Sequence, residues 1–203
     1  MGDTQQKTDK KKVVILAAAN DLFRHYPPSK VGIRDIAMKA NVSVVTIYNH
    51  FQSKERLVLE LIKQVVNGQI EVLKDITDSD SAFETKIETI VFKQSQLVSS
   101  FHPEFVNLMV SDPEISKYLT DIYQETLMKL FTDVIAHGKA EGYIDPILPD
   151  SLVISIMQLF NKDIQSKDSV LLSNHHISDI HTKILEIMIY GFSGKTRIKR
   201  DDV

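Results

Sequence analysis

Two short helical patterns joined by a three-residue turn constrain the fold of this chain more than any other feature. They lie between Gly32 and Lys54. Apolar residues in the first pattern recur at i, i+3, i+4 and i+7, at Ile33, Ile36, Ala37 and Ala40. Asn41 follows at the place where helices most readily end in a left-handed residue. We therefore predict a helix, a tight turn and a second helix.

The second pattern begins at Ser43, a residue type that caps helix N-termini, with Val42 and Ile47 spaced to pack against each other across the cap. Its apolar positions, Ile47 and Phe51, predict one buried face. The remaining faces carry small, aromatic and amide side chains, namely Val45, Thr46, Tyr48, Asn49 and His50. Side chains of these types suit the base edges and the backbone of DNA. A nucleic-acid partner is therefore predicted.

Composition narrows the class of protein. The 203 residues include no cysteine, which excludes a disulfide framework and a thiolate metal site. No apolar run approaches the roughly 20 residues needed to span a bilayer, and the N-terminus lacks the apolar segment of a signal peptide. We expect a soluble cytoplasmic protein with no membrane partner.

Charge is distributed unevenly along the chain. The formal net charge is −3, yet residues 1–56 hold 10 Lys and Arg against 5 Asp and Glu, and the remainder holds 14 against 22. A cationic N-terminal segment on an anionic body is the asymmetry expected of a small DNA-binding unit attached to a larger domain.

Helical periodicity continues through almost the whole chain, and no segment alternates as a strand, so the predicted fold is all-α. The first helix is expected over residues 10–26, with Pro27 and Pro28 ending it. A polar break at residues 77–81 is the best candidate for a linker. Ser81 and Glu84 then form a capping-box pattern at the start of another helix.

The C-terminal half shows further start and stop signals. Asp112 followed by Pro113 predicts the start of a long helix that ends near Gly142, and Asp150 opens another. A last helix is expected over residues 177–192. We see no repeat at a fixed period.

The N-terminal strings resemble the tetracycline-repressor-like (TetR/AcrR) family of bacterial transcription regulators. The matching strings are ILAAANDLF from Ile15 to Phe23, then IRDIAMKANVS, then TIYNHFQSKERL. The resemblance implies an all-helical homodimer, and we expect no cofactor. It implies a helix-turn-helix DNA-binding domain in residues 1–54 and an effector-binding and dimerisation domain in residues 55–203.

The resemblance also implies which residues contact DNA. Arg34 and Lys54 would neutralise phosphates. On the second helix of the motif, Tyr48 and His50 would donate to phosphate oxygens, and Thr46 and Asn49 would reach base edges or the thymine methyl. Val45 is a further contact position on this helix. Val45 stands where the family commonly has glycine. Gly32 stands where threonine or serine is common, which leaves only a backbone amide for that phosphate contact.

Aromatic and methionine side chains in the larger half could line an effector cavity or form ordinary core. They are Phe92, Phe105, Met109, Tyr123, Phe131, Met157 and Phe160. The two C-terminal helices could form an isologous dimer contact. Its candidate residues are Leu152, Ile156, Leu159, Leu185, Met188 and Ile189.

Our leading hypothesis is a repressor that binds a palindromic operator as a homodimer and is released by a small, largely apolar effector. One alternative is a metal-assisted hydrolase that uses His175, His176 and His181. Another is a DNA-attached, partner-binding protein without an effector. No glycine-rich phosphate loop, G-x-S-x-G elbow or H-E-x-x-H motif is present, so we expect no enzyme.

Overall fold

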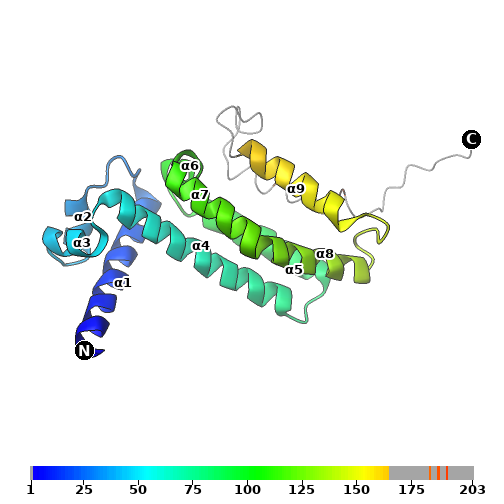
Figure 1. Cartoon of the computed structure of the whole chain (residues 1–203), viewed down its shortest axis with the longest axis horizontal. Helices are drawn as coiled ribbons and strands as arrows, with labels where there is room; N and C mark the ends of the chain where they lie inside the picture. The colour runs from blue at the N-terminus through cyan, green and yellow to red at the C-terminus, as the bar shows by residue number, and fades with distance from the viewer. Residues whose placement is uncertain (1, 165–182, 184–186, 188–190, 192–203) are drawn as a thin grey trace, which may run out of the picture. The chain divides into compact units, whose positions relative to one another are not determined.

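The computed structural model describes residues 2–164 and the single positions 183, 187 and 191. Over these residues the chain is helical and has no strand, which confirms the predicted all-α class (Figure 1). The elements in order are α1 (Gly2–His25), α2 (Ile33–Lys39), α3 (Val44–Phe51), α4 (Lys54–Asp78), α5 (Phe83–Ser99), α6 (Pro103–Ser111), α7 (Pro113–Ile122), the π-helical η1 (Tyr123–Leu127), α8 (Met128–Ala140) and α9 (Asp150–Ile164).

The chain divides into two compact units. Unit 1 contains residues 1–69 and 99–115, and unit 2 contains residues 70–98 and 116–203. Helix α4 is continuous from Lys54 to Asp78, so it contributes its first part to unit 1 and its last part to unit 2. The functional boundary expected at residue 54 coincides with the start of α4 and stays a prediction.

Helix α1 ends at His25, one residue before the predicted end at residue 26 and two residues before Pro27. Its buried stripe includes Ile15, Ala19 and Phe23, each with no exposed surface. The predicted start at residue 10 is wrong, because the helix begins at Gly2. Apolar periodicity, which is the basis of the prediction, starts only near Val13. The polar residues before it carry no such pattern, so the sequence does not show that the helix extends further toward the N-terminus.

An aromatic cluster joins α1 to α6 within unit 1. The Phe105 ring stacks on Phe23 with centroids 5.3 Å apart and on Phe101 at 4.8 Å. The guanidinium of Arg24 lies 4.7 Å from the Phe101 ring centroid, and the His102 amide donates to the Phe23 carbonyl at 3.1 Å. Stacked rings and a backbone bond therefore hold α6 against the end of α1.

Unit 2 has its own core of Phe83, Ile135, Ile144 and Val153. Helix α8 ends in a Schellman motif, in which the Tyr143 amide donates to the Gly138 carbonyl at 2.8 Å and Gly142 has φ of +76°. This agrees with the predicted end near Gly142.

The long helix expected from Asp112 is interrupted. The Asp112 carboxylate caps α7 by accepting from the amides of Glu114 and Ile115, as the sequence predicts, but the π-helical turn η1 separates α7 from α8. Helix α9 starts at Asp150 as expected. The helix expected over residues 177–192 lies largely outside the described residues. Among the helices described, none has the length and apolarity required to cross a membrane.

Candidate nucleic-acid interface

Local sequence signals fix the turn between α2 and α3. Asn41 adopts φ of +53°, the left-handed conformation expected for it. The Val42 amide donates to the Ala37 carbonyl at 3.0 Å, which closes a Schellman motif at the end of α2. Ser43 Oγ then accepts from the Thr46 amide at 3.0 Å and caps α3. Both predictions for this turn are confirmed.

Helix α3 buries one face and exposes the other. Ile47 and Phe51 are buried, as predicted. On the opposite face Val45 is 65 % exposed, Tyr48 is 49 % exposed and Asn49 is also exposed. The exposure of Tyr48 rules out a core role for this tyrosine in the structure. A short helix that presents a methyl-bearing, a phenolic and an amide side chain to solvent can meet DNA edges and phosphates together.

Two further positions of α3 lie beside this exposed face. The Thr46 hydroxyl is hydrogen-bonded to Ser43 Oγ at 2.8 Å, so it takes part in the cap. Because a hydroxyl can both donate and accept, it can form a further hydrogen bond with another partner. His50 is half-buried, and its ring centroid lies 6.2 Å from that of Phe51.

The junction after α3 is strained. Gln52 has φ of +67° and ψ of −41°, and the Ser53 amide donates to the Phe51 carbonyl at 2.8 Å. These values describe a γ-turn with positive φ, which is rare for a residue with a side chain. Ser53 Oγ caps α4 by accepting from the Arg56 amide at 3.2 Å. The cap was predicted, but no sequence signal revealed the turn.

The start of α2 is arranged differently from the expectation. The Gly32 amide donates to Asp35 Oδ2 at 2.7 Å, so the backbone donor proposed for a phosphate contact already has an acceptor. Arg34, two residues further on, is exposed and can meet a phosphate from this end of α2.

Lys54 has a contact that its motif position did not predict. Its ammonium donates to the Pro28 carbonyl at 2.6 Å and is partly buried. Ser29, the next residue in this loop, donates through Oγ to the Glu104 carboxylate at 2.9 Å. The loop between α1 and α2 is therefore fixed to the start of α4 and to α6. Both contacts join residues far apart in sequence, so no local pattern could have revealed them.

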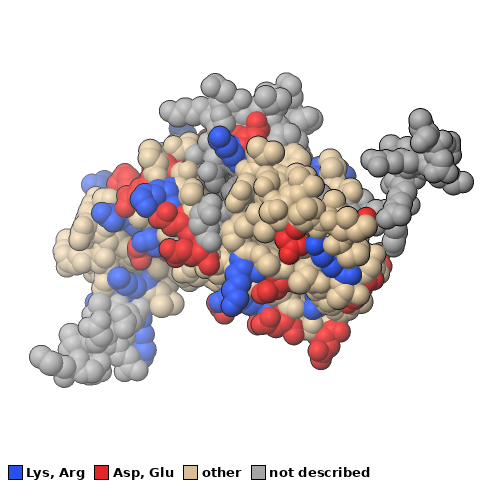
Figure 2. All heavy atoms as spheres, turned by 45° about the vertical axis from the view of Figure 1, so that its right-hand side comes forward, with Lys and Arg blue, Asp and Glu red and all other residues tan. Residues whose placement is uncertain are grey.

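The basic N-terminal segment lies next to α3. Lys12 Nζ lies 5.9 Å from the Phe51 ring centroid, a cation–π distance, while Lys10 and Lys11 are exposed. Figure 2 shows Lys and Arg interspersed with Asp and Glu on the face in view, without one large patch of a single sign. Positive charge near α3 is therefore carried by individual side chains.

Two carboxylates stabilise the helices of this region. Asp21 on α1 pairs with Lys39 on α2 at 2.5 Å, and the hydrogen bond from Lys39 lowers the pKa of Asp21. At the start of α4, hydrogen bonds from its own backbone amide and from Ser53 lower the pKa of Glu55. Both carboxylates are exposed, so solvent screens these interactions.

The effector-cavity candidates fall in both units of the chain, with Phe105 and Met109 in unit 1 and the others in unit 2. Phe92 is 61 % exposed on α5, and Phe105 belongs to the aromatic cluster of unit 1. Met109, Phe131 and Phe160 are half-buried. The side chains of Tyr123 and Met157 lie outside the described part of the structure. The cavity lined by these residues stays a prediction.

The dimer candidates on α9 are accessible in the single chain. Leu152 and Leu159 are exposed by 46 % and 66 %, and Ile156 is half-buried. Leu185, Met188 and Ile189 lie outside the described residues, as do His175, His176 and His181 of the metal hypothesis. Among the residues that are described, no group of three potential ligands is placed to hold a metal ion.

Comparison with known proteins bears on this geometry. The sequence model of the family described as "Bacterial regulatory proteins, tetR family" matches residues 15–61, which include α2, α3 and the start of α4. The HTH-type transcriptional repressor KstR2 of Mycobacterium tuberculosis is 27 % identical over 145 residues, which cover 68 % of this chain and 72 % of that protein.

Two further similarities extend over most of the chain. The fatty acid metabolism regulator protein of Bacillus subtilis is 24 % identical, with 94 % of this chain and 100 % of that protein covered. The crystal structure of FadR from Bacillus subtilis in complex with stearoyl-CoA has a TM-score of 0.58 and 19 % identity, and covers 88 % of this chain and 98 % of that one. At this identity the structural likeness shows the fold alone. Together with the matched helix-turn-helix segment, these similarities show that the chain belongs to the TetR/AcrR family of bacterial transcriptional regulators.

Proposed function

We propose that this protein is a cytoplasmic repressor that binds a palindromic operator as a homodimer and releases it when a small molecule binds. The observation that carries the proposal is the exposed face of α3, on which Val45, Tyr48 and Asn49 are accessible while Ile47 and Phe51 anchor the helix. A helix anchored on one face and open on the other can enter the major groove.

Residues 1–54 form the DNA-reading domain in this proposal. Arg34 and Lys54 contact phosphates, and Thr46 and Asn49 read base edges. Tyr48 and His50 donate to phosphate oxygens, while Val45 contacts a thymine methyl or the sugar edge. The exposure of Arg34 and of the α3 face supports these assignments.

Residues 55–203 hold the effector and the dimer contact. The exposed leucines of α9 support an isologous contact, because two such helices from each subunit can form a four-helix interface. The repressor name of KstR2 and the stearoyl-CoA complex of Bacillus subtilis FadR support repression and a partly apolar effector. The relatives are regulators, and they favour this function over a hydrolase.

Footprinting of the DNA upstream of the protein's own gene tests the proposal. Purified full-length protein should protect two symmetric half-sites whose centres are about one helical turn, or a multiple of it, apart. Tyr48→Ala should remove the protection at the same protein concentration. Weak binding that is indifferent to sequence at physiological salt would contradict a specific regulator.

A further inference from the structure

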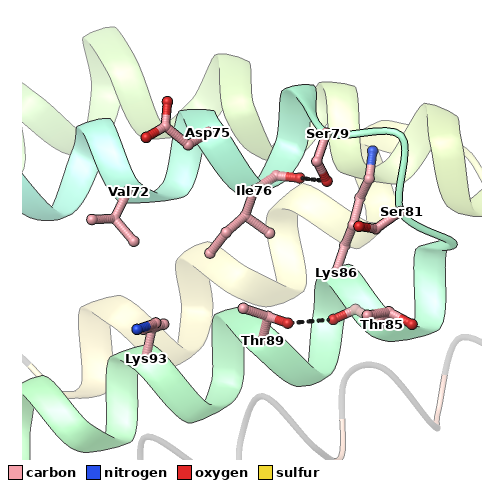
Figure 3. Close-up of a pocket in the computed structure, with 9 residues that line it drawn as sticks. All are labelled: Val72, Asp75, Ile76, Ser79, Ser81, Thr85, Lys86, Thr89 and Lys93. Atoms are coloured by element: carbon pink, nitrogen blue, oxygen red, sulfur yellow. Dashed lines mark hydrogen bonds between the residues drawn. The ribbon is translucent and has the colours of Figure 1, made fainter.

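A groove between the C-terminal half of α4 and α5 combines buried positive charge with an apolar floor. Its volume is about 250 Å³ and it lies within unit 2 (Figure 3). The lining positions on α5 are Thr85, Lys86, Thr89 and Lys93, which recur at helical spacing and share one face. The facing positions of α4 belong to its last two turns.

Lys86 is the most unusual residue of this groove. Only 6 % of it is exposed, which makes it a buried lysine. Its side chain extends from α5 toward the end of α4 (Figure 3). There Nζ donates to the Thr77 carbonyl at 2.8 Å. Within the described part of the chain, no carboxylate lies within ion-pair distance of this ammonium. One carbonyl satisfies one of its three N–H donors, and a buried ammonium without a counter-ion is costly.

Hydroxyl groups surround the same end of the groove. Ser79 donates to the Ile76 carbonyl at 2.8 Å and Thr89 donates to the Thr85 carbonyl at 2.7 Å (Figure 3). The hydroxyls of Ser81 and Thr85 also line the groove and can donate to an acceptor placed beside them. An anion at this end would receive donors from an ammonium and from hydroxyls together.

The rest of the groove is apolar, with Val72 and Ile76 of α4 as its floor. Exposed Lys93 and exposed Asp75 line it as well, so their charges offset each other there. The lining of the groove therefore has a net charge of +1, which Lys86 supplies, while Asp133 lines a small neighbouring cavity together with Lys86. A ligand that fits has a compact anionic head and a short apolar stem.

We propose that this groove binds an organic anion, with a carboxylate or phosphate head beside Lys86 and an aliphatic stem over Val72 and Ile76, and that this anion is the effector. The inference rests on the proposed function, because it names the chemical class of the effector and a place where it binds. Coulombic attraction and hydrogen bonds to the head make the groove selective for a negatively charged ligand, and burial of the apolar stem adds affinity.

Calorimetric titration of the full-length protein tests the charge preference. The probes are octanoate, octyl phosphate, octylammonium and inorganic phosphate, each below the concentration at which it forms micelles. Octanoate or octyl phosphate should bind at least tenfold more tightly than octylammonium, and the tighter of the two identifies the head group. Inorganic phosphate should bind more weakly than octyl phosphate because it leaves the floor uncovered. Equal affinity for octanoate and octylammonium overturns the proposal.

Variants locate the site. Lys86→Gln should weaken octanoate binding at least tenfold, and circular dichroism checks its fold, because this change also removes the bond to Thr77. Lys93→Gln, at an exposed position, should weaken binding by about threefold through lost long-range attraction. Lys129→Gln removes one exposed lysine of the same unit outside the groove and should leave binding unchanged. Equal effects of Lys93→Gln and Lys129→Gln overturn the site.

Operator binding separates this inference from the proposed function. Saturating octanoate should lower the operator affinity of the unchanged protein and not that of Lys86→Gln. Octanoate binding without a change in operator affinity overturns the effector assignment. The absence of a specific operator complex without any ligand contradicts the proposed function itself.

Discussion

The ammonium of Lys54 donates a hydrogen bond to the carbonyl of Pro28 at 2.6 Å. This bond joins the first residue of α4 to the loop that leads into α2, so one side chain fixes the relative position of two elements of the DNA-reading domain. A lysine at this motif position was expected only to meet a phosphate. Because an ammonium has three donors, it can hold the loop and still present a donor to DNA.

Lys54→Ala should therefore have two effects. Loss of a partly buried, charge-assisted hydrogen bond should lower the free energy of unfolding by about 1–3 kcal/mol. Loss of a phosphate contact should weaken binding evenly across DNA sequences and reduce the salt slope by about one unit. Denaturant unfolding and fluorescence anisotropy at several salt concentrations measure these quantities.

Lys30→Ala is the matched control, because Lys30 is an exposed lysine of the same loop. It removes the same charge without removing the Pro28 contact, so it should leave the unfolding free energy within about 0.5 kcal/mol of the unchanged protein. If both variants unfold alike, the Pro28 bond does not stabilise the domain.

Tyr48→Ala should weaken operator binding by about tenfold, or about 1.4 kcal/mol, because the ring lies on the exposed face of α3. Dimerisation, followed by light scattering, should be unaffected. Tyr26→Ala provides the comparison, since Tyr26 is 55 % exposed in the same unit but follows α1 and is not part of α3. Equal operator affinity of the two variants would show that the contact surface lies elsewhere.

The features of this fold that depend on neighbouring residues are predictable from the sequence. The left-handed Asn41, the Ser43 cap and the burial of Ile47 depend on residues only a few positions apart, so their patterns predict them. The capping box expected at Ser81 and Glu84 is replaced by distant partners. The Phe83 amide donates to Glu141 at 3.0 Å, and Glu84 accepts from Tyr143 at 3.2 Å.

Contacts between residues far apart in sequence also determine the surroundings of the larger side chains, and these contacts were not predictable. From the sequence, Phe105 could be an aromatic residue that lines a cavity. Helical periodicity predicts which face of α6 is buried, but it does not predict which side chains contact that face. In the structure its neighbours are Phe23 and Phe101, and it forms a packed cluster with them. The π-helical turn at residues 123–127 likewise has no periodicity signal, since its one-residue shift changes the apolar pattern only slightly.

Gly138→Ala should destabilise the protein by about 1–3 kcal/mol. A Cβ at this position would lie 2.7 Å from the Phe83 ring and 2.9 Å from Ile144 Cδ1, both within the core of unit 2. Gly68→Ala in α4 is the matched control, because no atom lies within 4 Å of its added Cβ. Helix propensity should make that variant about 0.5–1 kcal/mol more stable. The midpoint of thermal unfolding should therefore fall for Gly138→Ala and rise for Gly68→Ala. A Gly138→Ala variant that is as stable as the unchanged protein would contradict the close packing.

Gln52→Gly should stabilise the protein by about 1 kcal/mol, because glycine removes the steric cost of positive φ at the γ-turn between α3 and α4. Gln52→Ala keeps a Cβ at the same strained position and is the control, with no comparable gain expected. Denaturant unfolding of both variants decides the matter. Equal stability of the glycine and alanine variants would mean that the turn stores no strain.

Acid should weaken the contact between Asp21 and Lys39. The hydrogen bond from Lys39 lowers the pKa of Asp21 below the ordinary value of an aspartate, so the folded state binds this proton less readily than the unfolded chain. The pair therefore contributes stability above about pH 4, and the contribution is lost as the pH falls through the lowered pKa.

Asp21→Asn should remove this part of the pH dependence, measured as denaturation midpoints between about pH 2 and pH 7. Lys39→Gln should remove the same part, and the double variant should lose no more than either single one, because both changes break one pair. Additive losses would show that the two residues act separately.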